Sequence, residues 1–221
     1  MAQHPRSSTS AVGLSDDPVE NLSAWLQHNQ KTILTVVGVV AVSAAVIFGY
    51  RWMSEGKRGE ANRALYEATG PMQQGKLPEA QAALEKVVSK FGGTASGAQA
   101  SMLLAQVLFD QKKYQEGITA LEKSKGSAGS DFAASFEALM ATGYEELGKF
   151  DQAAEHYGKA AAAAKYPLDK GAHLAAQARD LTTAGKLAEA RKIWEELAKD
   201  ESLPFAQEAQ VRIGELAGAG K

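Results

Sequence analysis

Histidines and adjacent carboxylates are the side chains of this chain that could bind a metal or carry a proton. The four histidines are scattered along the sequence: His4, His28, His156 and His173. None of them has a carboxylate at metal-ligand spacing on one helix face. We expect His156, which follows Glu155, to be a surface residue. The pairs Glu145-Glu146 and Glu195-Glu196 are typical of solvated helix faces and not of an acid–base pair.

Other signatures of catalysis are missing from the sequence. The chain has no cysteine, which excludes thiolate metal sites and cysteine nucleophiles. It has no phosphate-binding loop, no dinucleotide fingerprint and no G-x-S-x-G turn. Its 24 basic and 26 acidic side chains nearly balance and form no basic stripe, so nucleic acid is not an expected partner. We expect a protein that is not an enzyme and that binds no cofactor or metal.

The composition predicts an all-α fold. Outside one apolar segment, the chain is rich in Ala, Glu, Lys, Gln and Leu, which are good helix formers. Residues that favour strands, such as Ile, Val and Thr, are scarce there.

One short phrase recurs in the second part of the chain. Its copies start at residues 75, 112, 148 and 185, so 37, 36 and 37 residues separate them. The copies are Gly75-Lys76-Leu77-Pro78-Glu79-Ala80, Lys112-Lys113-Tyr114-Gln115-Glu116-Gly117, Gly148-Lys149-Phe150-Asp151-Gln152-Ala153 and Gly185-Lys186-Leu187-Ala188-Glu189-Ala190. A glycine at the first position ends a helix in the left-handed conformation. The small last residue lets a second helix pack closely, so the phrase predicts a helical hairpin.

Small and large apolar residues recur in phase with this phrase. The small positions of the first helices are Ala68, Ala105, Ala141 and Ala178, and large residues three positions later are Leu108, Tyr144 and Leu181. The second helices carry Leu84, Leu121, Tyr157 and Trp194. In the first copy Pro71 takes the large position, so we expect the helix to kink there.

This pattern resembles the tetratricopeptide repeat, a helix–turn–helix unit of about 34 residues. The resemblance implies an α-solenoid of about four repeats over residues 57–203. Residues 204–221 then form a capping helix and tail, with Phe205, Ala209, Ile213 and Leu216 on one face.

Residues 32–50 form an uncharged, mostly apolar stretch between Lys31 and Arg51. As an α-helix, nineteen residues span about 28 Å, which is close to the hydrocarbon thickness of a bilayer. Tyr50 and Trp52 at one end are typical of an interfacial aromatic belt. A cleaved signal peptide fits less well, because the apolar run is too long and no small-residue cleavage site follows it. The stretch therefore predicts a transmembrane helix that contacts the lipid bilayer.

One face of this predicted helix is small: Gly38, Ala41, Ala45 and Gly49. Small residues at this spacing let a second membrane helix approach closely. The alternative is that an Ala-rich chain produces such a stripe by chance.

Residues 1–31 are expected to form a tail with a short amphipathic helix. Its apolar face is Val19, Leu22, Trp25 and Leu26, at helical spacing. The polar face lacks the Lys and Arg of a lipid-surface helix, which favours a protein partner. A short solvated helix is the alternative.

The inner curve of such an array, lined by the first helix of each pair, is its usual binding surface. The repeat's groove positions fall on Asn62, Leu65, Thr69 and Met72, on Gln99, Met102, Gln106 and Phe109, on Ser135, Ala138, Thr142 and Glu145, and on Ala172, Ala175, Arg179 and Thr182. From these we select Leu65, Met72, Met102, Gln106, Phe109, Thr142, Glu145 and Arg179 as partner-binding residues. Leu65, Met72, Met102 and Phe109 would form an apolar strip, and the flexible methionine side chains would suit binding to varied apolar polypeptide segments. The alternative is that several of them pack against a neighbouring helix.

The segment from Val19 to Trp52, followed by degenerate repeats, resembles the family of ancillary subunits of the SecYEG translocon. The features that carry the resemblance are the amphipathic helix with Trp25, the span that ends in Arg51-Trp52, and the repeats. The resemblance implies a bacterial inner-membrane protein with a cytoplasmic N-terminus and periplasmic repeats. Its implied partners are the SecYEG translocon, a membrane-anchored periplasmic prolyl-isomerase chaperone, and unfolded or emerging polypeptides.

The charges around the span indicate the opposite orientation. Only Lys31 precedes the span closely, whereas Arg51, Lys57, Arg58 and Arg63 follow it. The positive-inside rule would place the repeats in the cytoplasm. We favour the periplasm because of the resemblance, and the reverse orientation is the alternative.

Together these patterns predict a membrane-anchored protein-binding scaffold that helps the Sec translocon to receive or chaperone translocated proteins. One alternative is an envelope scaffold that organises cell-division or cell-wall machinery, and another is a cytoplasm-facing repeat adaptor. The Lys, Arg and Asn set that clamps a C-terminal carboxylate in chaperone-adaptor repeats is missing. That absence argues against such partners.

Overall fold

The computed structural model describes residues 25–26 and 28–219, which fall into two compact units, 1–54 and 55–221. All regular structure among the described residues is helical, which confirms the predicted all-α solenoid class. Helix α2 (Gln30–Gln73) has residues in both units. It includes Pro71, where we expected a kink, and ends two residues later.

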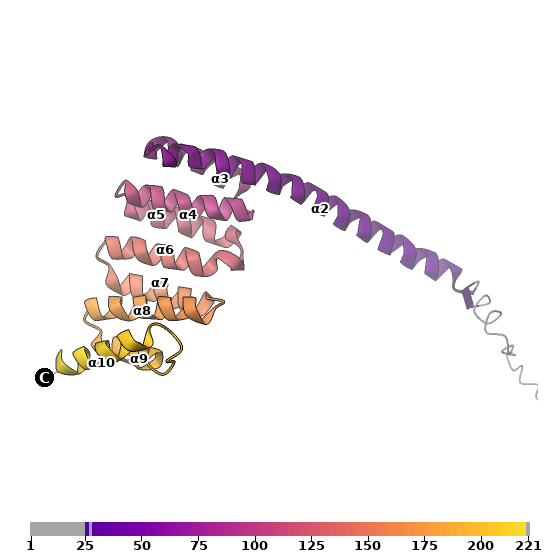
Figure 1. Ribbon diagram of the computed structural model, residues 1–221. Coiled ribbons are helices and arrows are strands. Elements are labelled where there is room, and N and C mark those ends of the chain that lie inside the picture. Colours follow the sequence, from indigo (N-terminus) through magenta and orange to yellow (C-terminus); the bar gives the residue numbers. More distant parts are fainter. Residues whose placement is uncertain (1–24, 27, 220–221) are drawn as a thin grey trace, which may run out of the picture. The chain divides into compact units, whose positions relative to one another are not determined.

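The second unit stacks helical hairpins one on another (Figure 1). After the end of α2 come α3 (Leu77–Phe91), α4 (Ala95–Asp110), α5 (Tyr114–Ala128), a short 3-10 turn η1 (Ser130–Phe132), α6 (Ala133–Glu146), α7 (Phe150–Ala163), α8 (Pro167–Thr183), α9 (Leu187–Leu197) and α10 (Ala206–Ala219). From α3 onward, each helix packs mainly against the helices that precede and follow it in sequence.

The recurring phrase forms the hairpin turns, as predicted. Gly75, Gly148 and Gly185 have φ values of 71°, 67° and 80°. Lys112 occupies the same place in the second hairpin with a φ of 60°. In each turn the next residue's N–H donates to the carbonyl five residues back, as from Lys113 to Leu108 (2.8 Å). This hydrogen bond closes the helix end in the Schellman manner.

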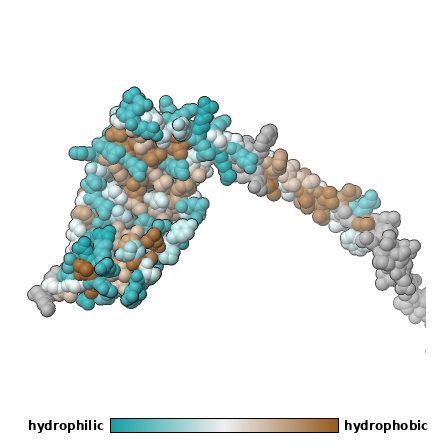
Figure 2. All heavy atoms as spheres, in the orientation of Figure 1, coloured by the Kyte–Doolittle hydropathy of each residue, from teal (hydrophilic) through white to brown (hydrophobic). Residues whose placement is uncertain are grey.

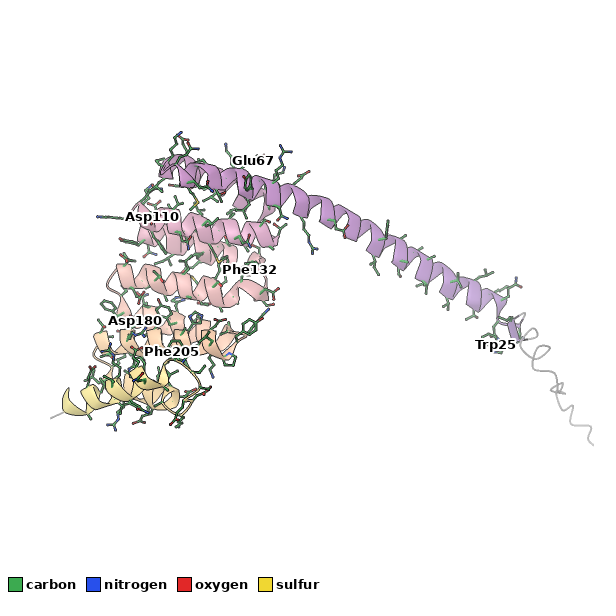
Figure 3. All side chains as sticks on the ribbon, viewed as in Figure 1. Trp25, Glu67, Asp110, Phe132, Asp180 and Phe205 are labelled. Atoms are coloured by element: carbon green, nitrogen blue, oxygen red, sulfur yellow. The ribbon has the colours of Figure 1, made fainter. Side chains whose placement is uncertain are left out.

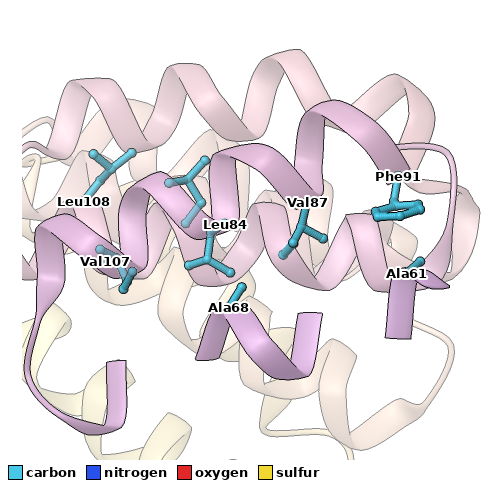
Figure 4. Close-up of a cluster of buried hydrophobic side chains, with 10 residues drawn as sticks. Ala61, Ala68, Leu84, Val87, Phe91, Val107 and Leu108 are labelled. Carbon is cyan, nitrogen blue, oxygen red and sulfur yellow. The ribbon is translucent and has the colours of Figure 1, made fainter. Parts of the chain in front are cut away.

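The predicted small residues lie where helices meet. Ala68, Ala105, Ala141 and Ala178 are buried in the first helices, and Ala80, Gly117, Ala153 and Ala190 are buried in the second helices. In the first hairpin, Leu84, Val87 and Phe91 of α3 pack around Ala61 and Ala68 of α2 (Figure 4). Two further clusters of buried side chains fill the middle and the end of the stack.

Helix α10 covers the last hairpin. Ala209 is fully buried in the third cluster, and Phe205, Ile213 and Leu216 pack against the cluster. These are the four residues of the expected capping face. The arrangement protects the apolar end of the solenoid from water.

Within the first unit and the described residues, one stretch, Gln30–Gly49, is long and apolar enough to cross a membrane. Its apolar side chains stand out in Figure 2, and none of the stretch is buried within the chain. Gly38, Ala41, Ala45 and Gly49 all lie on this exposed part of α2. Trp25 and Leu26 are helical and exposed, while Val19 and Leu22 lie outside the described residues.

Candidate functional site

The first helices of three hairpins enclose a groove of about 790 Å³. Helices α4, α6 and α8 form its walls, and Tyr157 of α7 and the α7–α8 turn complete it. The lining residues are Gln99, Met102, Leu103, Gln106, Asp131, Ala134, Ser135, Ala138, Leu139, Thr142, Tyr157, Ala163, Ala164, Lys165, Tyr166, Asp169 and His173. This is the surface on which tetratricopeptide-type arrays are expected to bind partners.

Helix α6 gives the groove a floor of small side chains. Ala134, Ser135, Ala138 and Thr142 follow one another on its groove-facing side. The Thr142 hydroxyl donates to the Ala138 carbonyl (3.2 Å), which satisfies its donor within the helix. Because these side chains are short, the floor leaves room for a guest's main chain and side chains.

Helix α4 supplies a wall that combines apolar and amide groups. Met102 and Leu103 are half-buried, whereas Gln99 and Gln106 are exposed, seven residues apart on the same face. An amide side chain can both donate and accept hydrogen bonds, which suits the main chain of a polypeptide. The wall can thus contact apolar side chains and peptide groups together.

At the α7–α8 turn, one end of the groove carries charged side chains and an exposed aromatic ring. Asp131 of η1 pairs with Lys165 of the α7–α8 turn at 2.5 Å, and both side chains are largely exposed. The Lys165 ammonium lowers the pKa of Asp131. An exposed pair of this kind contributes little to stability. Beside it, Tyr166 is 68% exposed.

Tyr157 closes the other end of the groove. Its hydroxyl donates to the Glu145 carboxylate (3.0 Å) and lies 3.4 Å from the Thr142 hydroxyl. Burial, together with the nearby Glu145, raises the pKa of Tyr157 to about 12. The ring stacks on His173, with 6.4 Å between ring centres. Burial lowers the pKa of His173, so its imidazole is neutral at neutral pH.

Asp180 lies next to Glu145 and is almost completely buried. The residue is 4% exposed, and its Oδ2 atom has no hydrogen-bond partner. Burial and then the neighbouring Glu145 raise the pKa of Asp180 to about 7. Asp180 therefore keeps its proton to a higher pH than a solvated aspartic acid does.

The structure distributes the eight selected groove residues over several environments. Met102, Gln106 and Thr142 line the groove, and Glu145 is bonded to Tyr157 at its end. The other four contact neighbouring helices of their own unit: Leu65, Met72, Phe109 and Arg179.

Those four residues make identifiable contacts. Leu65 and Met72 are half-buried against the first hydrophobic cluster, and Phe109 packs against the second. Arg179 donates two hydrogen bonds to Glu208 of α10, at 2.9 and 2.6 Å. Of the predicted apolar strip, only Met102 reaches the groove cavity.

Sequence reasoning missed Tyr157 and His173 as groove residues. Tyr157 was placed among the large residues of the second helices, and His173 was treated as one of the scattered histidines. The available signal for His173 was Asp169, four residues before it on the same face of α8, so the expectation that no histidine shares a helix face with a carboxylate is wrong for His173.

The expectation for His156 is wrong. Its side chain is 14% exposed, and its Nδ1 atom lies 2.7 Å from the Glu137 carboxylate of α6. The imidazole also stacks on Tyr144, and Lys125 of α5 pairs with the same carboxylate. Burial acts to raise the pKa of Glu137, but the hydrogen bonds with Lys125 and His156 lower it overall. His156 therefore belongs to a buried polar network joining α5, α6 and α7, which local sequence could not reveal.

Among the described residues, no three His, Asp or Glu side chains gather as they would to hold a metal ion.

Comparison with protein families matches residues 61–183 to the tetratricopeptide repeat-like domain. The chain belongs to this family. The matched segment begins in the first hairpin and ends with α8, so it contains the whole groove. Tetratricopeptide repeat-like domains are typically non-catalytic scaffolds for protein binding.

Solved structures share the fold at low sequence identity. A putative kinesin light chain with nearly identical repeats from Podosopora anserina is 18% identical, with a TM-score of 0.56, over 74% of this chain and 88% of that chain. A tetratricopeptide repeat protein from Parabacteroides merdae is 16% identical, with a TM-score of 0.57, over 72% and 60%. BtubC (BKLC) from P. vanneervenii is 12% identical, with a TM-score of 0.54, over 75% and 84%. No curated protein matches the sequence.

Proposed function

We propose that the chain is a membrane-anchored scaffold whose groove holds segments of other polypeptides. The observation that carries this proposal is the cavity of about 790 Å³ along three successive hairpins. Its floor of small side chains and its exposed amides suit an extended segment with few sequence requirements. The apolar stretch Gln30–Gly49 is the proposed anchor, because its length and composition match a bilayer.

Within this proposal, the repeats serve the Sec translocon as an accessory subunit that receives or chaperones translocated proteins. The support is the resemblance of residues 19–52 to ancillary translocon subunits. The proposed partners are SecYEG, a membrane-anchored periplasmic prolyl-isomerase chaperone and emerging polypeptides. The proposed location is a bacterial inner membrane with the repeats in the periplasm.

Cross-linking from the groove in intact cells tests the proposed partners. A photoreactive amino acid replaces Met102, which is half-buried in the groove wall. The matched control carries it at Lys192, which is exposed on α9 away from the groove. We expect cross-links to translocon subunits and secreted chains from Met102 and not from Lys192. Cross-linking from position 102 to a single cell-division or cell-wall protein would favour the envelope scaffold instead.

Membrane attachment and orientation have separate tests. Alkaline carbonate should leave the chain in the membrane fraction, and release into the supernatant would refute the anchor. Alkaline phosphatase fused after Lys221 should be active if the repeats face the periplasm. Fluorescence of a cytosol-only reporter at that position would instead favour the cytoplasm-facing adaptor.

A further inference from the structure

Two carboxyl groups with too few hydrogen-bond donors lie beside the Tyr157 end of the groove, outside its lining. Glu145 of α6 accepts a hydrogen bond from Tyr157, and the neighbouring Asp180 of α8, which Figure 3 labels, has an unpartnered Oδ2 atom. A buried polar atom without a partner costs free energy, so native structures keep few of them. The pair therefore requires a further positive group, which can be a proton or a cation from outside.

Each helix around the pair contributes differently to its charge. Helix α7 presents the Tyr157 hydroxyl, and α8 itself carries neutral His173 and charged Arg179. Glu208 of α10 holds Arg179 in a two-point ion pair. Helix α9 contributes the Trp194 indole, which lies 6.0 Å from the Arg179 guanidinium. The nearby cation is thus already engaged, and the carboxyl pair keeps its negative charge.

The two carboxyls differ in access. Glu145 is half-buried and linked through Tyr157 to the groove lining, whereas Asp180 is almost completely buried. Because Tyr157 lines the groove and donates to Glu145, a guest at this end of the groove lies next to the residue that holds the Glu145 carboxylate.

Resting on the proposed function, we propose that Glu145 receives a basic side chain of the bound polypeptide, an Arg guanidinium or a Lys ammonium. The guest's cation then neutralises the negative charge of the Glu145 carboxylate. The preferred guest is then a small or apolar segment that carries one basic residue at the Tyr157 end of the groove. A charge-assisted contact in a partly desolvated site is stronger than an exposed ion pair.

Two matched peptides test this assignment on the full-length chain in lipid nanodiscs. Both are blocked nine-residue peptides of Ala, Leu and Ser, with either Arg or its neutral analogue citrulline at the centre. Binding is measured by the fluorescence anisotropy of the labelled peptide. At pH 8 we expect the Arg peptide to bind about tenfold more tightly, the effect of one charge-assisted contact. At pH 6 the preference should shrink, because Asp180 then holds its proton more firmly, while citrulline binding stays constant.

Variants connect the preference to the carboxyl pair. Glu145→Gln should bind both peptides equally, and Asp180→Asn should remove the pH dependence of the Arg preference. Glu189→Gln, on the exposed face of α9, is the matched control and should behave like the wild-type chain.

Two outcomes would overturn the assignment while leaving the groove proposal intact. One is equal binding of the two peptides to the wild-type chain at pH 8. The other is an Arg preference that survives in Glu145→Gln. Failure of both peptides to bind would contradict the proposed function and this inference together.

Discussion

At the scale of single residues, the turn at Lys112 departs from the other three turns. A side chain with a Cβ atom costs roughly 1 kcal/mol in the left-handed conformation, whereas glycine adopts it freely. Lys112 has a φ of 60° and is exposed.

We therefore predict that Lys112→Gly stabilises the chain by about 1 kcal/mol. Urea unfolding of the detergent-solubilised protein, followed by circular dichroism, measures the change. Lys113→Gly, at the neighbouring position with a φ of −89°, is the control and should not stabilise. A loss of stability in Lys112→Gly would contradict the assigned turn conformation.

Asp180 makes stability depend on pH. Its pKa is about 7 in the folded chain and near 4 when unfolded, so the folded state holds the proton more tightly. Such a group stabilises the fold fully below the unfolded pKa, and the contribution is lost as the pH rises through the folded pKa.

We predict that the wild-type chain loses on the order of 1–3 kcal/mol of unfolding free energy between pH 4 and pH 8 relative to Asp180→Asn. Denaturant unfolding at several pH values measures this difference. Asp110→Asn, at an exposed site on α4, should follow the wild-type pH profile. Parallel profiles for the wild type and Asp180→Asn would show that folding does not raise the pKa of Asp180.

At the scale of helices, Phe109 occupies a space left by two glycines on neighbouring elements. A Cβ atom on Gly117 of α5 would lie 2.4 Å from the Phe109 ring. One on Gly143 of α6 would lie 2.7 Å from both the ring and Ile118. The three helices α4, α5 and α6 therefore meet more closely than larger side chains would allow.

We predict that Gly143→Ala destabilises the chain by about 1–3 kcal/mol through overpacking. The control is Gly126→Ala in α5, where the new methyl group meets open space and should stabilise by about 0.5–1 kcal/mol. Phe109→Leu should cost less in the Gly143→Ala background than in the wild type. Equal costs in both backgrounds would contradict the close approach.

Features of this protein that depend on neighbouring residues could be predicted from the sequence, whereas features that depend on contacts between distant residues could not. The hairpins follow from local rules, because a left-handed glycine and a small residue five positions later act within one helix–turn–helix unit. The membrane candidate likewise follows from one uninterrupted apolar run.

Parts of the groove depended on contacts between distant residues. Met102 and Thr142 line the groove because their positions in α4 and α6 lie on the helix faces that border it. Phe109 lies on the same helix as Met102, but its ring packs between helices instead. The space for the ring exists because Gly117 of α5 and Gly143 of α6 have no side chain. Glu145 and Asp180 come from different hairpins, so no local sequence pattern predicts that they lie next to each other.

At the scale of the whole molecule, the array is quasi-linear. Three hydrophobic clusters follow one another along the stack, and each helix from α3 onward packs mainly on its sequence neighbours. In such arrays stability is approximately a sum of hairpin terms and nearest-neighbour terms.

We predict that a destabilising substitution in the last hydrophobic cluster increases local unfolding only in the helices around that cluster. Trp194 is fully buried there, and Trp194→Ala should cost about 3–5 kcal/mol. Hydrogen exchange should rise in α8, α9 and α10 and remain near wild-type values in α3 and α4. Leu84→Ala, in the first cluster, should give the converse pattern. A uniform rise along the whole array would show that it unfolds as one cooperative block.

The near-identical hairpin turns also bear on how such a chain can change its length. Because each junction between hairpins reuses the same kind of contact, duplicating one segment of 36 or 37 residues would copy an existing joint and require no new one. Gene duplication could thereby lengthen the inner surface in steps of one hairpin. The helix that seals the far end would travel unchanged with the final unit.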